Sequence, residues 1–347
     1  MGKRKRPEAN RRTEALVVVS GAGALELASD RDRVRETARE SKAPRTLHEY
    51  TRALRSFAGW CQTRSLDPRP ADPVAAADVV TLYLQHRFDA GRKRSTVEQD
   101  LAAIAWAYQD AGLSSPSKHP VVRAFVSALR RRYAARGSQV EQKAAATDRE
   151  LVEMLGALPA TSTGVRDRAL LLIGWAGAFR RSELAALDRA DVAEDRDGLV
   201  VTLRRSKTDQ EGAGLAKAIP FGPTADRCPV RSLRAWLELA AITEGPVFRA
   251  VDRHGHVSRR AMDPGSIARA VRRAATLAKL TAPQGSAGFS GHSLRAGFVT
   301  SAARRGCSEA TIMAQTGHKS TMTLRGYIRR ATPFQDNAAP AVVGMLG

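Results

Sequence analysis

Six side chains in the second half of the sequence could together break and rejoin a phosphodiester bond. Two are arginines, which stay protonated at any working pH and can bind the non-bridging oxygens of a phosphate. Two are histidines, whose ordinary pKa near neutrality suits proton transfer. A lysine could protonate the leaving oxygen, and a late tyrosine could attack the phosphorus. The six are Arg180, Lys207, His292, Arg295, His318 and Tyr327.

The histidines and the tyrosine lie towards the end of the chain. His292 and Arg295 are three residues apart, which places both on one face of a helix. A tyrosine hydroxyl has an ordinary pKa of about 10, so Tyr327 needs a base or a cationic surrounding, and His292 is the candidate base. His318 follows Gly317. We expect it at the start of a helix, where it could bind the phosphate with help from the helix N-terminus.

Taken alone, each of these segments is more often structural. The pair Arg180-Arg181 after an apolar helix usually lies in solvent, and so does a lysine in a loop. Their combination is what indicates attack on a phosphodiester. No cluster of His, Asp or Glu has the spacing of metal ligands, and no glycine-rich phosphate loop occurs. We therefore expect neither a metal nor a nucleotide cofactor.

Composition points to a polyanionic partner. The 347 residues include 56 Lys and Arg against 35 Asp and Glu, a net charge of +21. Nucleic acid is the first candidate partner and an acidic membrane surface the second. The hydrophobic share of 43% excludes wholesale disorder, and three widely spaced cysteines exclude a disulfide framework or a zinc finger. No apolar run reaches the ~18 residues of a membrane-spanning helix.

The chain divides into segments of different character. Residues 1–42 are basic; an apolar stretch within them superficially resembles a signal peptide, but glycines and glutamates interrupt it. We interpret residues 1–42 as a poorly ordered arm and expect a cytoplasmic protein. Apolar periodicity predicts four helices in residues 43–137. Residues 138–147 are the expected linker, residues 148–332 the catalytic domain, and residues 333–347 a tail.

The expected fold is mainly α with a small antiparallel β-sheet. Leu199–Leu203 is the clearest strand, and Ala216–Phe221 is its expected partner in a hairpin. Lys207 lies in the loop that joins them. Helices are expected at 230–241, 266–280, 293–305, 309–316 and 321–329.

The segments around the first arginine resemble a catalytic box of the tyrosine recombinase (phage integrase) family, and the resemblance covers residues 148–330. Arg180 matches the first catalytic arginine, with Arg181 as the fallback assignment. Glu183 matches an acidic position that supports the active site, and Lys207 matches the hairpin lysine. One departure is Ala178, which stands where the family usually has glycine.

The later segments resemble the remaining boxes of the same family. His292 and Arg295 match the His-x-x-Arg box, and His318 matches the histidine of the Gly-His box. Tyr327 matches the nucleophile. The second departure is Thr316, which precedes the Gly-His pair where a large apolar residue is common.

The resemblance implies a site-specific recombinase or integrase of the kind found on mobile elements. It implies a SAM-like core-binding domain in residues 43–137 and a C-shaped clamp around double-stranded DNA. It further implies a 3′-phosphotyrosyl intermediate, strand exchange through a Holliday junction in a tetramer, and no cofactor. The tail is expected to dock on a neighbouring subunit, with packing on its own subunit as the alternative.

Two other functions share part of this pattern. A type IB-like topoisomerase uses the same chemistry without paired sites, and a catalytically silent DNA-binding protein would share the charge and the helices. Most of the affinity for DNA should be electrostatic, with a few side chains reading the sequence. The candidate DNA contacts are Arg92, Lys93, Arg94, Arg123, Arg130 and Arg131.

Overall fold

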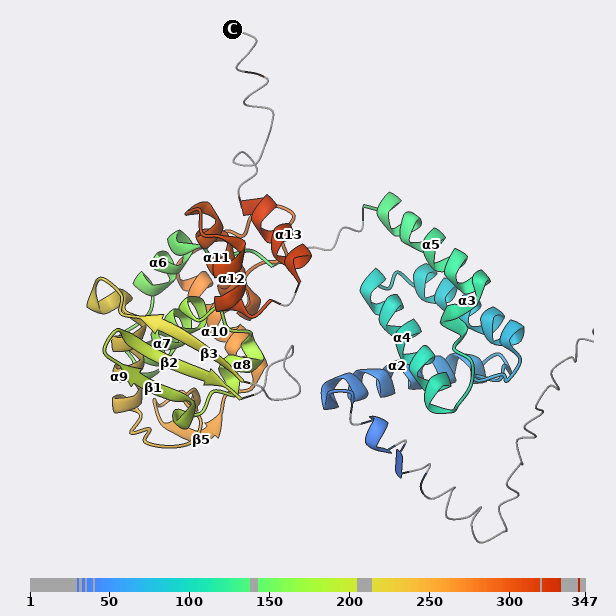
Figure 1. Cartoon of the computed structure of the whole chain (residues 1–347), viewed down its shortest axis with the longest axis horizontal. Helices are drawn as coiled ribbons and strands as arrows, with labels where there is room; N and C mark the ends of the chain where they lie inside the picture. The colour runs from blue at the N-terminus through green and yellow to red at the C-terminus, as the bar shows by residue number, and fades with distance from the viewer. Residues whose placement is uncertain are drawn as a thin grey trace, which may run out of the picture. The chain divides into compact units, whose positions relative to one another are not determined.

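The computed structural model describes residues 30, 33–34, 36–39, 41–137, 143–204, 214–318, 320–331 and 343 of the chain. It divides into two compact units, Met1–Val140 and Glu141–Gly347. Both are shown in Figure 1. Among the described residues, no helix is both long enough and apolar enough to cross a membrane.

In the part of the first unit that the structure describes, four helices build the core, as the apolar periodicity predicts. Proline stands at the first helical position of three of them, where its missing N–H costs nothing and its fixed φ favours the helix. Their apolar faces meet in a core that contains Phe57, Tyr83, Phe88 and Tyr133. The helices are α2 (Pro44–Gln62), α3 (Pro73–Asp89), α4 (Arg94–Asp110) and α5 (Pro120–Ala135).

The end of the expected N-terminal arm differs from the expectation. The described residues 36–39 are helical. The guanidinium of Arg39 donates to both carboxylate oxygens of Asp110, at 2.9 and 2.7 Å. This two-pronged ion pair ties the segment to the end of α4, and it is a long-range contact that local sequence patterns do not reveal. Residues 1–29 of the arm lie outside the described residues.

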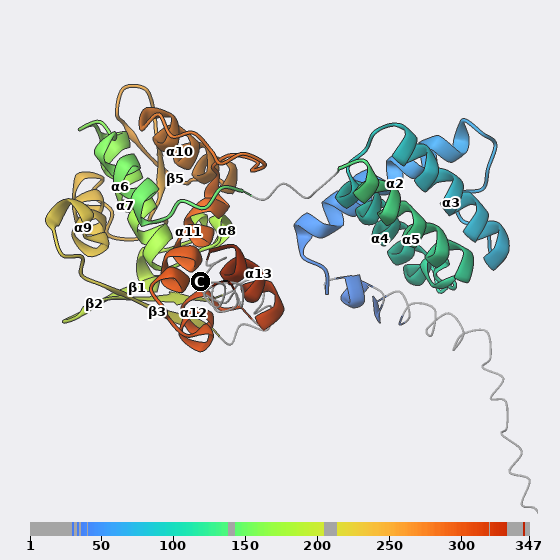
Figure 2. The same cartoon turned by 90° about the horizontal axis from the view of Figure 1, so that it is seen from above.

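The second unit combines helices with a small sheet, so the expected fold class is confirmed. Its helices are α6 (Asp148–Gly156), α7 (Ser162–Ala176), α8 (Arg181–Ala185), α9 (Pro229–Leu239), α10 (Pro264–Leu277), α11 (Gly291–Arg304), α12 (Glu309–Thr316) and α13 (Thr321–Ala331). Helix α7 is buried on nearly all sides from Ala169 to Gly174. It runs through the middle of the unit, with α9 on one side and α11 on the other (Figure 2).

The sheet has three antiparallel strands in the order β1-β2-β3. Strands β2 (Gly198–Leu203) and β3 (Leu215–Pro220) form the expected pair, and their register sets Val201 opposite Lys217. Strand β1 (Val192–Asp195) was not expected, because only its first residue is buried and it shows no apolar alternation. A second hairpin, β4 (Arg249–Val251) with β5 (Val257–Ala261), was also not expected, because half of its strand residues are polar and none is buried.

The expected linker at residues 138–147 is too long. Ala144 and Ala146 are buried in the core of the second unit. The Ala144 amide donates to the Gly288 carbonyl at 3.1 Å, and the Ala146 amide donates to the Ser293 carbonyl at 2.9 Å. The small side chains that suggested a flexible linker are the ones that allow this close packing. Residues 138–142 lie outside the described residues.

Candidate active site

The site is centred on a contact between two helices. Tyr327 lies on α13 and His292 on the first turn of α11, and the two helices pack against each other. The Tyr327 hydroxyl lies 2.7 Å from Nε2 of His292. The ring of His318 lies on the same tyrosine, with 6.4 Å between the ring centroids. The candidate nucleophile therefore has both histidines beside it.

The start of α11 holds His292 in place. Ser290 caps the helix: its hydroxyl accepts from the amide of His292 at 3.4 Å, and its own amide donates to the Ser293 hydroxyl at 2.8 Å. Gly291 makes a close approach here, because a Cβ at this position would lie 2.9 Å from the Cβ of Arg181. A larger residue at position 291 would push α11 away from α8.

His292 is favoured in its neutral form. Partial removal of the ring from water lowers the pKa of His292 from the ordinary value of 6.5. The positive charges of Arg295, Arg180 and Arg181 lower it further. His292 keeps solvent-exposed surface, so we give most weight to the three guanidinium charges. Neutral Nε2 can accept the Tyr327 proton, as a general base must.

Arg295 supplies a buried cation with a spare donor. Its side chain is buried, and Nη1 donates to the Ala178 carbonyl at 2.8 Å. Its Nη2 is also buried and has no hydrogen-bond partner among the described residues. Burial, together with the charge of Arg180, lowers the pKa of Arg295 to about 10, so it stays protonated at neutral pH. An unpartnered guanidinium nitrogen beside the nucleophile suits an oxygen of a phosphate.

Arg180 is held at the entrance to α8 by one carboxylate. The buried Glu183 accepts from the Arg180 backbone N–H at 2.9 Å and from its Nη1 at 2.6 Å. The Arg180 side chain keeps partial exposure while Glu183 is nearly fully buried. The charge of Arg180 acts on Arg295, His292 and His318, whereas that of Arg181 acts on His292 alone among them. The geometry therefore favours Arg180 over the fallback Arg181.

Arg180 directly follows a turn at the end of α7, and this turn sets its position. The Phe179 amide donates to the Gly174 carbonyl, and the Ala178 amide donates to the Trp175 carbonyl. This is the Schellman pattern that ends many helices, and it places its penultimate residue in the left-handed region. Ala178 has φ +46°. The position where the family usually has glycine is therefore one where glycine would be unstrained.

His318 is not at the start of a helix. Gly317 ends α12 in the left-handed conformation, φ +66°, and α13 begins only at Thr321. Nδ1 of His318 lies 2.7 Å from the Thr316 hydroxyl. Burial, followed by the charges of Arg295, Arg180, His292 and Lys217, lowers the pKa of His318 to about 4. His318 is consequently neutral at neutral pH and oriented by Thr316, the second departure from the family pattern.

The structure thus brings together five of the six expected catalytic residues, while Lys207 lies outside the described residues. It also reveals a charged residue that the sequence analysis missed. Lys217 on β3 is 1% exposed, and its Nζ donates to the Gly177 carbonyl at 2.6 Å. The sequence feature that could have revealed its burial is the alternation of side chains along β3, which puts Lys217 on the same inward face as Ile219.

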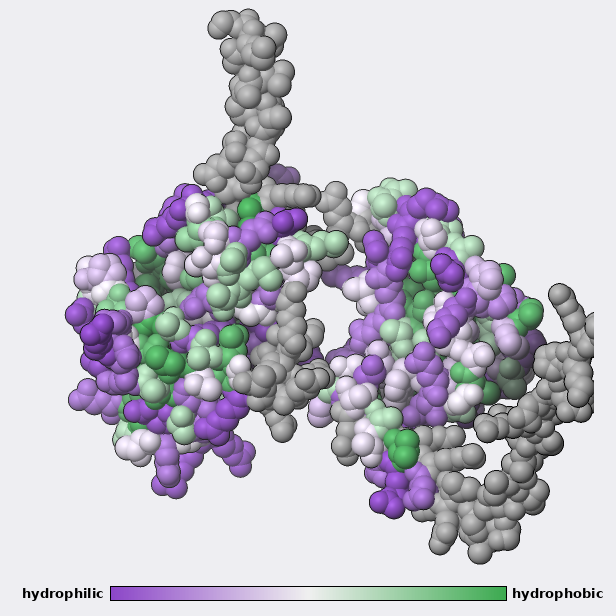
Figure 3. Space-filling model, viewed as in Figure 1, coloured by the Kyte–Doolittle hydropathy of each residue, from purple (hydrophilic) through white to green (hydrophobic). Residues whose placement is uncertain are grey.

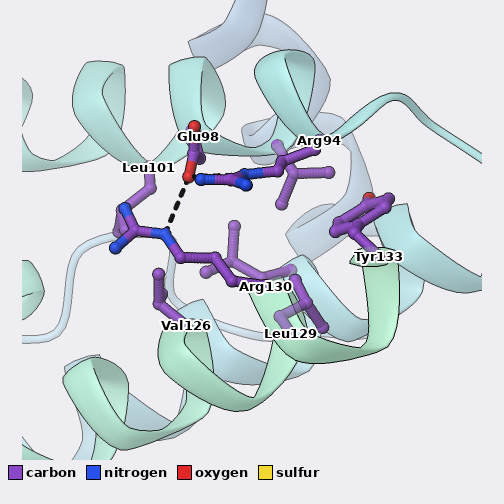
Figure 4. A pocket seen from close by; sticks show the side chains of 9 residues that line it. Arg94, Glu98, Leu101, Val126, Leu129, Arg130 and Tyr133 are labelled. Carbon is purple, nitrogen blue, oxygen red and sulfur yellow. Dashed lines mark hydrogen bonds and ion pairs between the residues drawn. The ribbon is translucent and has the colours of Figure 1, made fainter. Parts of the chain in front are cut away.

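The candidate DNA contacts lie on or beside α4 and α5 of the first unit. Arg94 and Arg130 both donate to one oxygen of Glu98, at 3.1 and 2.9 Å. Figure 4 shows the two guanidinium groups beside this carboxylate, with the bond from Arg130 as a dashed line. This shared carboxylate aligns two guanidiniums from different helices. The other candidates are exposed, and in the space-filling view hydrophilic side chains cover much of the visible surface (Figure 3). They are Arg92, Lys93, Arg123 and Arg131.

Within the described ranges, no group of three or more His, Cys, Asp or Glu side chains could hold a metal ion. Arg180, Arg295 and Lys217 form one basic cluster with Glu183 as its acidic neighbour, and Arg295 of this cluster interacts with Tyr327. This arrangement suits an anion that binds between the two guanidiniums.

Comparisons with known proteins show the family to which the chain belongs. The model of the phage integrase family matches residues 145–332. An integrase/recombinase xerD homolog from Selenomonas ruminantium is 36% identical over 303 residues, covering 86% of this chain and 85% of that protein. The Tn1549 transposon integrase in complex with circular intermediate DNA has a similar fold, with a TM-score of 0.59 at 14% identity over 90% of this chain and 96% of that chain. A lambda integrase tetramer bound to a Holliday junction gives a TM-score of 0.57 at 16% identity, over 90% and 79% of the two chains. The chain therefore belongs to the phage integrase family and is a tyrosine-type site-specific recombinase that acts on DNA.

Proposed function

We propose that the chain cleaves and rejoins double-stranded DNA at a specific site through a 3′-phosphotyrosyl intermediate. The observation that carries this proposal is the 2.7 Å contact between the Tyr327 hydroxyl and Nε2 of His292, beside the unpartnered Nη2 of Arg295. Every group that the chemistry needs at the phosphorus is a side chain of this protein.

In the proposed cleavage, the Tyr327 oxygen attacks the scissile phosphorus and its proton passes to Nε2 of His292. The bond between phosphorus and the 5′ oxygen breaks as the bond to tyrosine forms, so the phosphate stays a diester. Arg295 and Arg180 bind the non-bridging oxygens, where negative charge grows in the transition state. His318 lies against the same tyrosine. The anionic phosphate favours protonation of the His318 ring at Nε2, through which His318 then donates to a phosphate oxygen from the α12–α13 turn.

The leaving 5′ oxygen must take up a proton. We assign this role to Lys207, in the loop between β2 and β3, as the resemblance implies. Glu183 acts by holding Arg180 and does not exchange protons with the substrate. Ligation reverses these steps, with the 5′ hydroxyl of a new strand as the nucleophile, and it needs no energy source because the phosphotyrosyl bond conserves the energy of the phosphodiester.

Strand exchange requires at least two recombination sites, and we propose that four subunits assemble on them and pass through a Holliday junction. Support comes from the lambda integrase tetramer on a Holliday junction, whose fold this chain shares. We propose that the tail at residues 333–347 docks on the neighbouring subunit. The domain at residues 43–137 binds DNA through the arginines and lysine of α4, α5 and the turn before α4.

Covalent capture tests the proposed reaction. Fragments of the source genome bound by Tyr327→Phe identify a site, and a nicked duplex carrying that site traps the covalent complex. We expect wild type to give a band that survives denaturation, and Tyr327→Phe to bind the same duplex without forming it. Binding by wild type with no covalent band would instead indicate a silent DNA-binding protein. Relaxation of a plasmid that lacks the site would indicate a topoisomerase.

A further inference from the structure

Three consecutive backbone carbonyls at the end of α7 each accept a hydrogen bond from a side chain of a different element. Gln315 of α12 donates to the Ala176 carbonyl at 2.8 Å. Lys217 of β3 donates to the Gly177 carbonyl at 2.6 Å, and Arg295 of α11 donates to the Ala178 carbonyl at 2.8 Å. We call these three carbonyls the carbonyl row.

The carbonyl row sits where a helix needs partners most. The last carbonyls of an α-helix find no N–H donor within the helix, and they lie at the negative end of its dipole. Two of the three donors are cationic side chains, which this end of the dipole favours. Gly177 and Ala178 are buried, so solvent cannot replace the donors.

Lys217 is an unusual choice for this position. It is 1% exposed on the inward face of β3, opposite the fully buried Val201. Besides the Gly177 carbonyl, its Nζ contacts the face of the Phe179 ring, 4.6 Å from the centroid. Burial lowers its pKa to about 7, because the charged ammonium is less favoured here than in water. An apolar side chain would be enough for this inward-facing position of β3, so we look for a function of the amino group in the contacts that it makes.

That function lies in the residues it touches. Lys217 holds Gly177 and Phe179, the two neighbours of Ala178, and Arg295 holds the carbonyl of Ala178 itself. Ala178 is the strained left-handed residue of the turn, and Arg180 follows two residues later. The direction in which Arg180 leaves the turn therefore depends on how firmly this turn is held.

We propose that Lys217 is a positioning residue for Arg180: by holding the carbonyl row and the Phe179 ring, it fixes the turn that aims Arg180 at the scissile phosphate. This inference rests on the proposed function. It adds a second lysine to the site, one that never touches DNA. The charged neighbours of Lys217 are the acidic Glu183 and the basic Arg295 and Arg180.

The test is a double-mutant cycle in the full chain, with single-turnover cleavage of the nicked site duplex as the readout. Lys217→Met keeps the length of the side chain and removes the donor, and we expect cleavage to slow by about 10- to 100-fold. Lys217→Arg keeps a cationic donor and should recover part of this loss. In the Arg180→Ala background, Lys217→Met should cause no further loss, because Arg180 is the residue through which Lys217 acts.

The matched control is Ile219→Val, on the same inward face of β3, which perturbs packing without removing a donor. An equal slowing by Ile219→Val, or the same loss from Lys217→Met with and without Arg180, would overturn the proposal. Undiminished cleavage by Lys217→Met would overturn it too.

If thermal unfolding shows that Lys217→Met does not fold, Gln315→Met takes its place in the cycle, because Gln315 is only partly buried and donates to the same carbonyl row. Gln315→Met should slow cleavage with Arg180 present and cause no further loss in its absence. Failure of the proposed function is separate, since it would show as binding by wild type without a covalent band, or as a covalent band that survives Tyr327→Phe.

Discussion

Nε2 of His292 lies 2.7 Å from the hydroxyl of Tyr327, although the two residues are 35 positions apart and belong to different helices. The arginines that would bind the phosphate are also the groups whose charges lower the pKa of His292. One cluster of cations therefore serves two purposes: it attracts the anionic substrate and keeps the neighbouring imidazole neutral. A neutral imidazole is the form that can take the tyrosine proton.

The first prediction concerns the pH dependence of cleavage. Protonated His292 cannot act as a base, and its lowered pKa delays protonation to more acid conditions than for a free histidine. We expect the cleavage rate at subsaturating DNA, which reports the free enzyme, to fall to half its maximum below pH 6.5. His292→Gln should be slow and lack this acid limb. A wild-type midpoint at or above pH 6.5 would contradict the assignment.

The second prediction concerns stability in acid. The pKa of His318 falls from 6.5 to about 4 on folding, so between these values the unfolded chain binds more protons than the folded one. Stability from this residue is therefore complete above pH 6.5 and is lost as the pH falls towards 4. We expect urea midpoints of wild type to drop between pH 7 and pH 4.5 by more than those of His318→Gln. Equal drops would show that His318 is not desolvated in the folded state.

Much of the fold was accessible from sequence because it follows local rules. The four helices of the first unit have apolar periodicity, three of them begin with proline, and the β2–β3 pair has a β-branched run. Strand β1 buries only Val192, and β4 and β5 bury no residue, so no local pattern marks them. Their pairing in hairpins stabilises them. The packing of Ala144 and Ala146 likewise depends on α11 and on the segment before it, which local composition does not show.

The site shows the same division. Arg180, His292 and Arg295 were predicted because their residue types suit phosphate chemistry. Lys217 was missed because a lysine in a strand is ordinarily assigned to the exposed face. Only the structure shows that its amino group meets the end of α7, a contact between residues 40 positions apart.

The third prediction concerns the strain at Ala178. This residue has φ +46°, which costs an L-residue roughly 1–2 kcal/mol, whereas glycine pays only its extra entropy. We expect Ala178→Gly to raise the free energy of unfolding by about 0.5–1 kcal/mol in urea denaturation. The control Ala235→Gly, at an exposed position within α9, should lower it by about 1 kcal/mol. The same sign in both variants would show that the turn is not strained.

The fourth prediction separates the two functions of Arg295. Its guanidinium donates to the Ala178 carbonyl and keeps Nη2 for the phosphate, and a lysine ammonium cannot reach in both directions. We expect Arg295→Lys to slow cleavage by roughly 10²–10³-fold. DNA binding at fixed salt should change little, because most affinity comes from the overall charge. Arg181→Lys, on the exposed face of α8, is the control and should cleave almost normally. Equal slowing in the two variants would contradict the placement of Arg295.

The fifth prediction concerns the hydroxyl of Thr316 and the tautomer of His318. Thr316 Oγ1 lies 2.7 Å from the Ile312 carbonyl, which can only accept, so its single proton points there. The hydroxyl must then accept from His318, 2.7 Å away, which places the imidazole proton on Nδ1 and leaves Nε2 as an acceptor. We expect ¹⁵N NMR at neutral pH to report the Nδ1–H form in wild type. Thr316→Val removes the acceptor and should shift the population towards Nε2–H, while Thr300→Val on α11 should leave it unchanged. A dominant Nε2–H form in wild type would mean that the Thr316 proton points to the imidazole instead.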